Sequence, residues 1–123
     1  MRATFVETKE FTKMLTKFLP DHEFAKLQKL LMKDSSAGTV MPGCGPLRKI
    51  RIPDAKRGKG KRGGARVIYL HVPEANRFYM LDIYGKDEKD DLSAYEKKEL
   101  RILAEELKTE AAVTHRRRAK EDK

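Results

Sequence analysis

The sequence is poor in cysteine and in long apolar runs. Cys44 is the single cysteine among 123 residues, so an internal disulfide is excluded, and we expect a structural thiol rather than a nucleophile. The chain has no stretch of about eighteen apolar residues that could span a membrane. It also has no apolar N-terminal run of signal-peptide length. These absences predict a cytoplasmic protein without a membrane partner, and the length is that of one domain.

Acidic residues are almost missing from residues 47–66, whereas basic residues are concentrated there. Asp54 is the one acidic residue of this segment. Its nine basic residues are Arg48, Lys49, Arg51, Lys56, Arg57, Lys59, Lys61, Arg62 and Arg66. Nine positive charges minus one negative charge give +8, against +9 for the whole chain. Such a concentration of positive charge is typical of a surface that binds a polyphosphate.

The hydrophobic pattern predicts an α+β domain with the element order β-α-α-β-β-β-α. Strands are expected at residues 4–6, 47–52, 66–72 and 77–84, and helices at 11–19, at 24–31 and after a capping box at Ser93–Glu96. Pro20 should separate the first two helices. The last three strands should pair as an antiparallel meander in a twisted, predominantly antiparallel sheet. The helices should pack on one face of this sheet and leave the other face to a ligand.

Three finer expectations follow from the same pattern. Residues 39–46 contain two prolines and two glycines and should form a loop. From about Thr109 apolar residues become rare, so residues 109–123 should be a charged, frayed tail behind a folded domain of residues 1–108. Strict alternation would place Tyr79, Leu81 and Ile83 on one face of their strand, with Phe78, Met80, Asp82 and Tyr84 on the other.

The segment Gly58–Gly63 matches the pattern G-x-G-x-x-G of dinucleotide-binding loops. Those loops need a helix directly after the glycines, because the pyrophosphate rests on the helix N-terminus. Here the apolar residues 66–72 follow, and they are typical of a strand. We therefore interpret residues 53–64 as a basic loop that grips phosphate, and we expect no bound cofactor. A solvated basic turn without a partner is the alternative.

Three segments in matching order resemble a known protein family. They are Leu47–Arg51, Gly58–Tyr69 and Phe78–Lys86. Together they resemble the RelE superfamily of toxins from bacterial toxin–antitoxin modules, and more closely its HigB-like branch. The resemblance implies a RelE-like fold and a ribosome-dependent endoribonuclease that cuts mRNA in the ribosomal A site. It also implies a cognate antitoxin that neutralises the toxin, and a toxin–antitoxin complex that binds operator DNA.

The resemblance further implies roles for individual residues. The family's reaction is attack by a ribose 2′-hydroxyl on the adjacent phosphate, which needs no metal. Arg66 would stabilise the transition state, and Lys59 and Lys61 would clamp phosphate or carry protons. Arg51 and Lys86 match two further basic positions of the catalytic site. The residues expected to bind RNA are Arg48, Lys49, Lys56, Arg57, Arg62 and Tyr84. Alternation would place Lys49 and Arg51 on one face of their strand, with Ile50 and Ile52 opposite.

The general base is left open by the sequence. The tyrosine of the best-known family members would fall near Ser93, and neither Tyr84 nor Tyr95 matches it cleanly. His71 and a lysine whose pKa is lowered by neighbouring cations are the other candidates, although a strand histidine is more often a packed residue. Two other functions stay open. One is a non-catalytic RNA- or DNA-binding module, and the other is an interaction protein whose basic surface meets an acidic partner.

Overall fold

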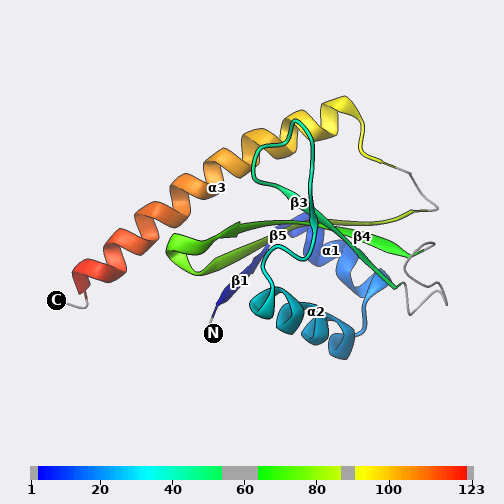
Figure 1. Cartoon of the computed structure of the whole chain (residues 1–123), viewed down its shortest axis with the longest axis horizontal. Helices are drawn as coiled ribbons and strands as arrows, with labels where there is room; N and C mark the ends of the chain where they lie inside the picture. The colour runs from blue at the N-terminus through cyan, green and yellow to red at the C-terminus, as the bar shows by residue number, and fades with distance from the viewer. Residues whose placement is uncertain (1–2, 54–63, 87–90, 122–123) are drawn as a thin grey trace.

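The computed structural model describes residues 3–53, 64–86 and 91–121, with side chains as far as residue 117. These residues form one sheet and three α-helices (Figure 1). The strands are β1 (Thr4–Glu7), β2 (Thr39–Val40), β3 (Arg48–Ile52), β4 (Ala65–Val72) and β5 (Arg77–Gly85), and the helices are α1 (Lys9–Phe18), α2 (Asp21–Lys33) and α3 (Ala94–Glu121). The predicted α+β class and order of elements are confirmed. The one addition is the two-residue strand β2, which lies where the sequence predicts only a loop.

The strands lie side by side in the order β1-β5-β4-β3-β2. β3, β4 and β5 form the predicted antiparallel meander, and the 3₁₀ turn η2 (Pro73–Ala75) joins the last two strands. The first strand, β1, lies on the other side of β5 and pairs with it in parallel. β4 and β5 are therefore central strands, and almost all of their residues are buried. Such strands need a cover on both faces of the sheet.

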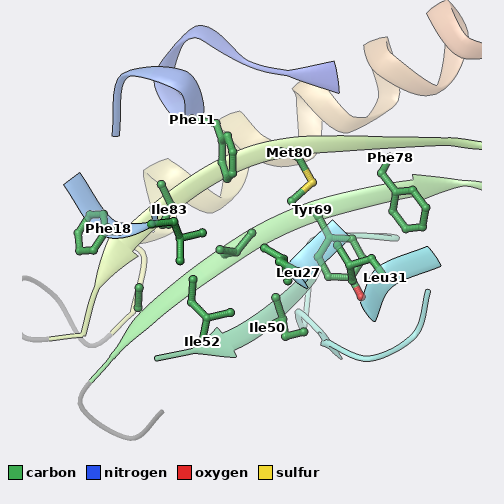
Figure 2. Packing of buried hydrophobic residues seen from close by; sticks show 13 residues of the cluster. Phe11, Phe18, Leu27, Leu31, Ile50, Ile52, Tyr69, Phe78, Met80 and Ile83 are labelled. Carbon is green, nitrogen blue, oxygen red and sulfur yellow. The ribbon is translucent and has the colours of Figure 1, made fainter. Parts of the chain in front are cut away.

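The helices α1 and α2 cover one face of the sheet, as the sequence predicts. The hydroxyl of Thr8 accepts a hydrogen bond from the backbone N–H of Phe11 at 3.1 Å and so caps the start of α1. Pro20 separates the two helices and occupies the N-cap position of α2. The first core cluster lies between these helices and the sheet (Figure 2). Its larger members are Phe11, Phe18, Leu27, Leu31, Ile50, Ile52, Val67, Tyr69, Phe78, Met80 and Ile83.

Helix α3 covers the opposite face, so the expectation that all helices share one face is wrong (Figure 1). The second core cluster joins α3 to Ile68, Leu70, Tyr79 and Leu81 of the central strands, through Ala104 and Ala111 with Leu100, Leu103 and Leu107 packed beside them. Burial of these strand residues requires an apolar cover, which α3 provides. We call this side of the sheet the α3 face. A ligand can therefore reach it only where α3 leaves it uncovered.

The helix α3 does not end near Thr109. It continues to Glu121, so the segment expected to be frayed is helical over the described residues. Ala111 is fully buried in the second core cluster, and Tyr79 donates a hydrogen bond to the carboxylate of Glu110 at 3.3 Å. Small residues gave little hydrophobic signal here, although they allow close packing on the sheet. The division of the chain at residue 108 stays a prediction.

A β-bulge at Leu81 changes which residues of β5 share a face. Tyr69 pairs with Met80 and Ile68 with Asp82, so the register passes over Leu81. Ile83 consequently packs in the first core cluster, whereas Tyr84 packs in the second. The strict alternation predicted for the end of this strand is therefore wrong from residue 82 onward. The bulge turns the side chain of Tyr84 toward the α3 face.

Cys44 is fully buried in the second core cluster beside Met41 and Leu47, which supports the structural interpretation of this thiol. The helices of the described ranges include none that combines the length and apolar character needed to cross a membrane.

Candidate functional site

Three cations of the sequence-predicted site lie on the same face of the sheet. Arg51 on β3 is the direct cross-strand partner of Arg66 on β4, and Lys49 is two residues before Arg51. Ile50 and Ile52 pack in the first core cluster, so Lys49 and Arg51 face the α3 side, as alternation predicts. We call Lys49, Arg51 and Arg66 the cation row. Like charges at directly opposite positions destabilise a sheet, which suggests that the row is kept for an anionic ligand.

Arg66 is the most enclosed member of the cation row. Its side chain is 4% exposed, and its Nη1 donates a hydrogen bond to the carbonyl oxygen of Ala65 at 3.2 Å. Burial lowers the pKa of Arg66, and the positive charge of Arg51 lowers this pKa further. A guanidinium nevertheless stays charged at neutral pH, because its usual pKa is above 12. Arg66 is therefore a fixed positive charge with little water around it, and such a charge interacts strongly with an anion.

Tyr84 is the partner of Arg66 on the other side, in β5. Its hydroxyl oxygen is buried. Burial and the negative charge of Asp91 raise the pKa of Tyr84 to about 12, although the positive charge of Arg66 acts in the opposite direction. The hydroxyl is therefore protonated near neutral pH. This disfavours Tyr84 as a general base, and its ring packs in the second core cluster.

The acidic residue that contacts the cation row, Asp91, is not among the residues predicted from the sequence. Its carboxylate contacts Lys49 Nζ at 3.4 Å and Lys97 Nζ at 3.0 Å, and it accepts a hydrogen bond from the backbone N–H of Leu92 at 2.8 Å. The hydrogen bond from Lys97, that from Leu92 and the charge of Lys49 lower the pKa of Asp91 to about 2. Asp91 and Lys49 are 42 residues apart in sequence. Spacing along the chain therefore could not reveal this pair.

The predicted capping box determines where α3 begins relative to the site. Ser93 Oγ accepts a hydrogen bond from the N–H of Glu96 at 3.1 Å, and Glu96 Oε1 accepts one from the N–H of Ser93 at 2.9 Å. These reciprocal bonds satisfy two N–H groups at the helix start. They also fix the first turn of α3, from which Lys97 reaches Asp91.

A cleft of about 860 Å³ brings the predicted residues together at the edge of β3. β2 pairs only with Arg48 and Lys49, so the end of β3 lies at the edge of the described sheet. The backbone N–H of Lys86 bonds the carbonyl oxygen of Gly64 at 3.0 Å, which keeps the end of β5 beside the start of β4. The described residues that supply basic groups to the cleft are Lys26, Lys49, Arg51, Arg66 and Lys86. Leucine and isoleucine side chains of α2 and β3 form its apolar wall.

Among the described residues, Arg48 is a predicted site residue that the fold does not bring to this cluster. Arg48 faces the first core cluster side, where its Nη1 donates a hydrogen bond to the carbonyl oxygen of Gly38 at 2.8 Å. The predicted loop residues Lys56, Arg57, Lys59, Lys61 and Arg62, and the motif Gly58–Gly63, lie outside the described residues. The element that follows is the strand β4, beginning at Ala65, and not a helix. The dinucleotide-binding interpretation therefore lacks the helix that it requires, as predicted.

His71 and Tyr95 are two further candidates for the general base. His71 stacks on Phe78 with ring centroids 4.3 Å apart, near the far end of β4, and burial lowers its pKa. It is therefore a packed residue. Tyr95 is 71% exposed on the first turn of α3. Within the described ranges, His, Cys, Asp and Glu side chains form no group of three or more that could hold a metal ion.

Comparison with known proteins is consistent with this fold. Residues 6–121 match the family model described as the RelE toxin of the RelE/RelB toxin–antitoxin system. Among solved structures, the free Escherichia coli toxin RelE, in a mutant form, is similar with a TM-score of 0.50 and 16% identity, over 73% of this chain and 90% of that chain. A chain of the archaeal RelE–RelB complex from Pyrococcus horikoshii has a TM-score of 0.48 and 18% identity, over 72% of this chain and 100% of that chain. At these identities the structural likeness concerns the fold alone.

Proposed function

This chain belongs to the family of RelE toxins of toxin–antitoxin systems, and we propose that it is an endoribonuclease that cleaves mRNA in the ribosomal A site. The observation that carries the proposal is the pairing of Arg51 with Arg66 on one face of the sheet, beside Lys49 and within one cleft. Three cations at such short spacing suit a phosphodiester. The assignment to the HigB-like branch stays a prediction.

The proposed reaction is an attack by the ribose 2′-oxygen on the adjacent phosphorus. The 2′-hydroxyl loses its proton to a base, the bond between phosphorus and the 5′-oxygen breaks, and the leaving 5′-oxygen takes up a proton. The products are a 2′,3′-cyclic phosphate and a free 5′-hydroxyl. Because RNA supplies its own nucleophile, the protein must align the attack and stabilise the negative charge that builds on the phosphoryl oxygens.

The cation row would supply that stabilisation. The guanidinium of Arg66 is enclosed and fixed before substrate arrives, so it needs little reorganisation when charge develops. Arg51 would contact the same phosphate from β3, and a guanidinium can offer two parallel N–H donors to phosphate oxygens. Lys86 lines the same cleft. We assign charge stabilisation to Arg66 and Arg51, and phosphate binding to Lys49 and Lys86.

Proton transfer requires groups other than Tyr84 and His71. The raised pKa of Tyr84 and the stacking of His71 on Phe78 disfavour both as bases. We propose that Lys59 and Lys61, which lie outside the described residues, clamp phosphate or carry protons. The cations Lys56, Arg57 and Arg62 of the same segment would bind the RNA backbone. These roles are proposals from the sequence.

We also propose that a cognate antitoxin protein silences this toxin, since the family model describes the RelE toxin of the RelE/RelB system. The antitoxin would cover the basic cleft or prevent ribosome entry by its bulk. The ribosome and mRNA are the other proposed partners, and operator DNA would be bound through the toxin–antitoxin complex. A complex that still entered ribosomes and cleaved mRNA would contradict the silencing proposal.

The test is cleavage of a defined mRNA on translating ribosomes, with the new 5′ ends mapped. The wild type should cut in the A-site codon, and a 2′-deoxyribose at the cut position should prevent the cut. Arg66→Ala should lower the cleavage rate roughly 100- to 1000-fold, which is the usual effect of one charge-stabilising donor. Lys13→Gln, an exposed change on α1, is the control for loss of one positive charge.

Two outcomes would contradict the proposal. A wild-type protein that leaves the mRNA intact on translating ribosomes is no ribosome-dependent nuclease, and binding without cleavage would favour the non-catalytic RNA-binding module. Full activity of the Arg66→Ala variant would show that the cation row does not stabilise the transition state. Arg51→Gln serves as a second variant if Arg66→Ala unfolds, which circular dichroism would show.

A further inference from the structure

Asp91 connects the start of α3 to the cation row through three contacts of unequal kind. Two of them lie within its own segment, the hydrogen bond from the N–H of Leu92 at 2.8 Å and the ion pair with Lys97 at 3.0 Å. The third is the ion pair with Lys49 of β3 at 3.4 Å, the longest of the three. Asp91 is therefore anchored to α3, and Lys49 is the partner that can leave without stripping the carboxylate of its other contacts.

Lys49 is also part of the cleft in which the proposed substrate would lie. It lines this cleft together with Arg51 and Arg66, and its side chain is 26% exposed. Residues two apart on a strand are separated by about 7 Å, which is close to the spacing of successive phosphates on one strand of RNA or DNA. The flexible stem of a lysine allows its ammonium group to move between neighbouring anions. A phosphate held by Arg51 and Arg66 would compete with Asp91 for Lys49.

We propose that Asp91 is a positioning residue. In the RNA-free protein it acts as an internal counter-anion that holds Lys49, and it releases Lys49 to an entering RNA phosphate. This inference rests on the RNA-binding part of the proposed function. The ion pair keeps Lys49 beside the cleft and makes every polyanion break one contact before Lys49 can bind it. A phosphate that also binds Arg51 and Arg66 gains enough binding free energy to break this ion pair. The pair therefore weakens indiscriminate binding of nucleic acid.

The experiment measures binding of a single-stranded RNA oligonucleotide that is 2′-O-methylated at every position, so that it cannot be cleaved. Asp91→Asn keeps the shape of the side chain and removes its charge. The variant should bind the oligonucleotide about two- to fivefold more tightly at low salt, which corresponds to an exposed ion pair.

Matched variants separate this role from a structural role and from net charge. Asp91→Glu keeps the charge and should bind like the wild type. Glu23→Gln removes a carboxylate that lines the cleft and pairs with Lys26 at 3.3 Å, and it should change the affinity less than Asp91→Asn does. If Asp91 had only a structural role at the start of α3, Asp91→Asn would lower the stability of the protein without raising its affinity for the oligonucleotide.

Double variants decide which lysine carries the effect. The gain from Asp91→Asn should vanish in a Lys49→Met background and persist in a Lys97→Met background. A gain that is absent, that persists without Lys49, or that Glu23→Gln reproduces in full would overturn the inference. If the wild type cleaves mRNA on ribosomes and Asp91→Asn gives no gain, only the role of Asp91 is wrong. If the gain follows Lys49 but no mRNA is cut, the counter-anion role stands and the nuclease proposal fails.

Discussion

Arg51 and Arg66 are directly opposite each other on the antiparallel strands β3 and β4, so two guanidinium groups occupy neighbouring positions on one face of the sheet. The charge of Arg51 lowers the pKa of Arg66, in addition to the larger effect of burial. A fold selected for stability alone would not place two cations in this way. The arrangement is expected where an anion is bound and where stability is exchanged for function.

The first prediction concerns this pair. Arg51→Gln removes one of the two opposed charges, so the free energy of unfolding should rise by about 0.5 kcal/mol at low salt. Cleavage of ribosome-bound mRNA should fall by at least about tenfold, because a charge on the phosphate loses its partner. Urea denaturation measures the first effect and 5′-end mapping the second. The control Lys13→Gln should leave both unchanged, and a less stable Arg51→Gln variant would show that the pair is not strained.

The second prediction concerns the pH dependence of stability. The pKa of Asp91 is about 2 in the folded protein, below its ordinary value of 3.8, so the ionised carboxylate stabilises the fold. This contribution is complete above about pH 4 and is lost as the pH falls toward 2. The wild type should therefore have a higher urea midpoint than Asp91→Asn at pH 6, and the two midpoints should converge near pH 2. A difference that is constant from pH 6 to pH 2 would contradict the assigned charge interaction.

The third prediction concerns Tyr84. Because its pKa is raised to about 12, the hydroxyl does not act as a base near neutral pH. Tyr84→Phe should keep the shape of the pH–rate profile between pH 6 and 9, with a loss in rate of less than about tenfold. Removal of a true general base would lower the rate about 100- to 10,000-fold and abolish one limb of the profile. Thermal unfolding of the variant shows whether a loss of rate reflects a loss of folded protein.

The fourth prediction concerns the C-terminal part of α3. Ala111 is fully buried against the sheet, whereas its neighbour Ala112 is exposed. Ala111→Arg should lower the free energy of unfolding by about 2–3 kcal/mol, because the longer side chain cannot fit and its charge cannot be buried. Ala112→Arg should change stability by less than about 0.5 kcal/mol. Equal effects of the two changes would mean that this part of the helix does not dock on the sheet.

Much of the local structure follows from short-range rules that the sequence displays directly. The alternation of Lys49 and Arg51 with two isoleucines on β3 places the cations on one face, because side chains of a strand alternate. The capping box at Ser93 marks the start of α3, because its two hydrogen bonds join residues only three positions apart. The strand that begins at Ala65 argues against a dinucleotide loop, because such a loop requires a helix directly after its glycines.

The tertiary structure alone decided which distant residues meet. Passing over Leu81 in the register of β5 turned Tyr84 toward Arg66, and no local pattern announces such a bulge. The burial of Ala111 and the docking of α3 on the second face depend on a sheet that is apolar on both sides. The contact of Asp91 with Lys49 joins two segments that only the complete fold brings within 3.4 Å. Patterns of charge and hydrophobic periodicity describe residues that are close in sequence. The site, in contrast, is assembled by packing between distant segments.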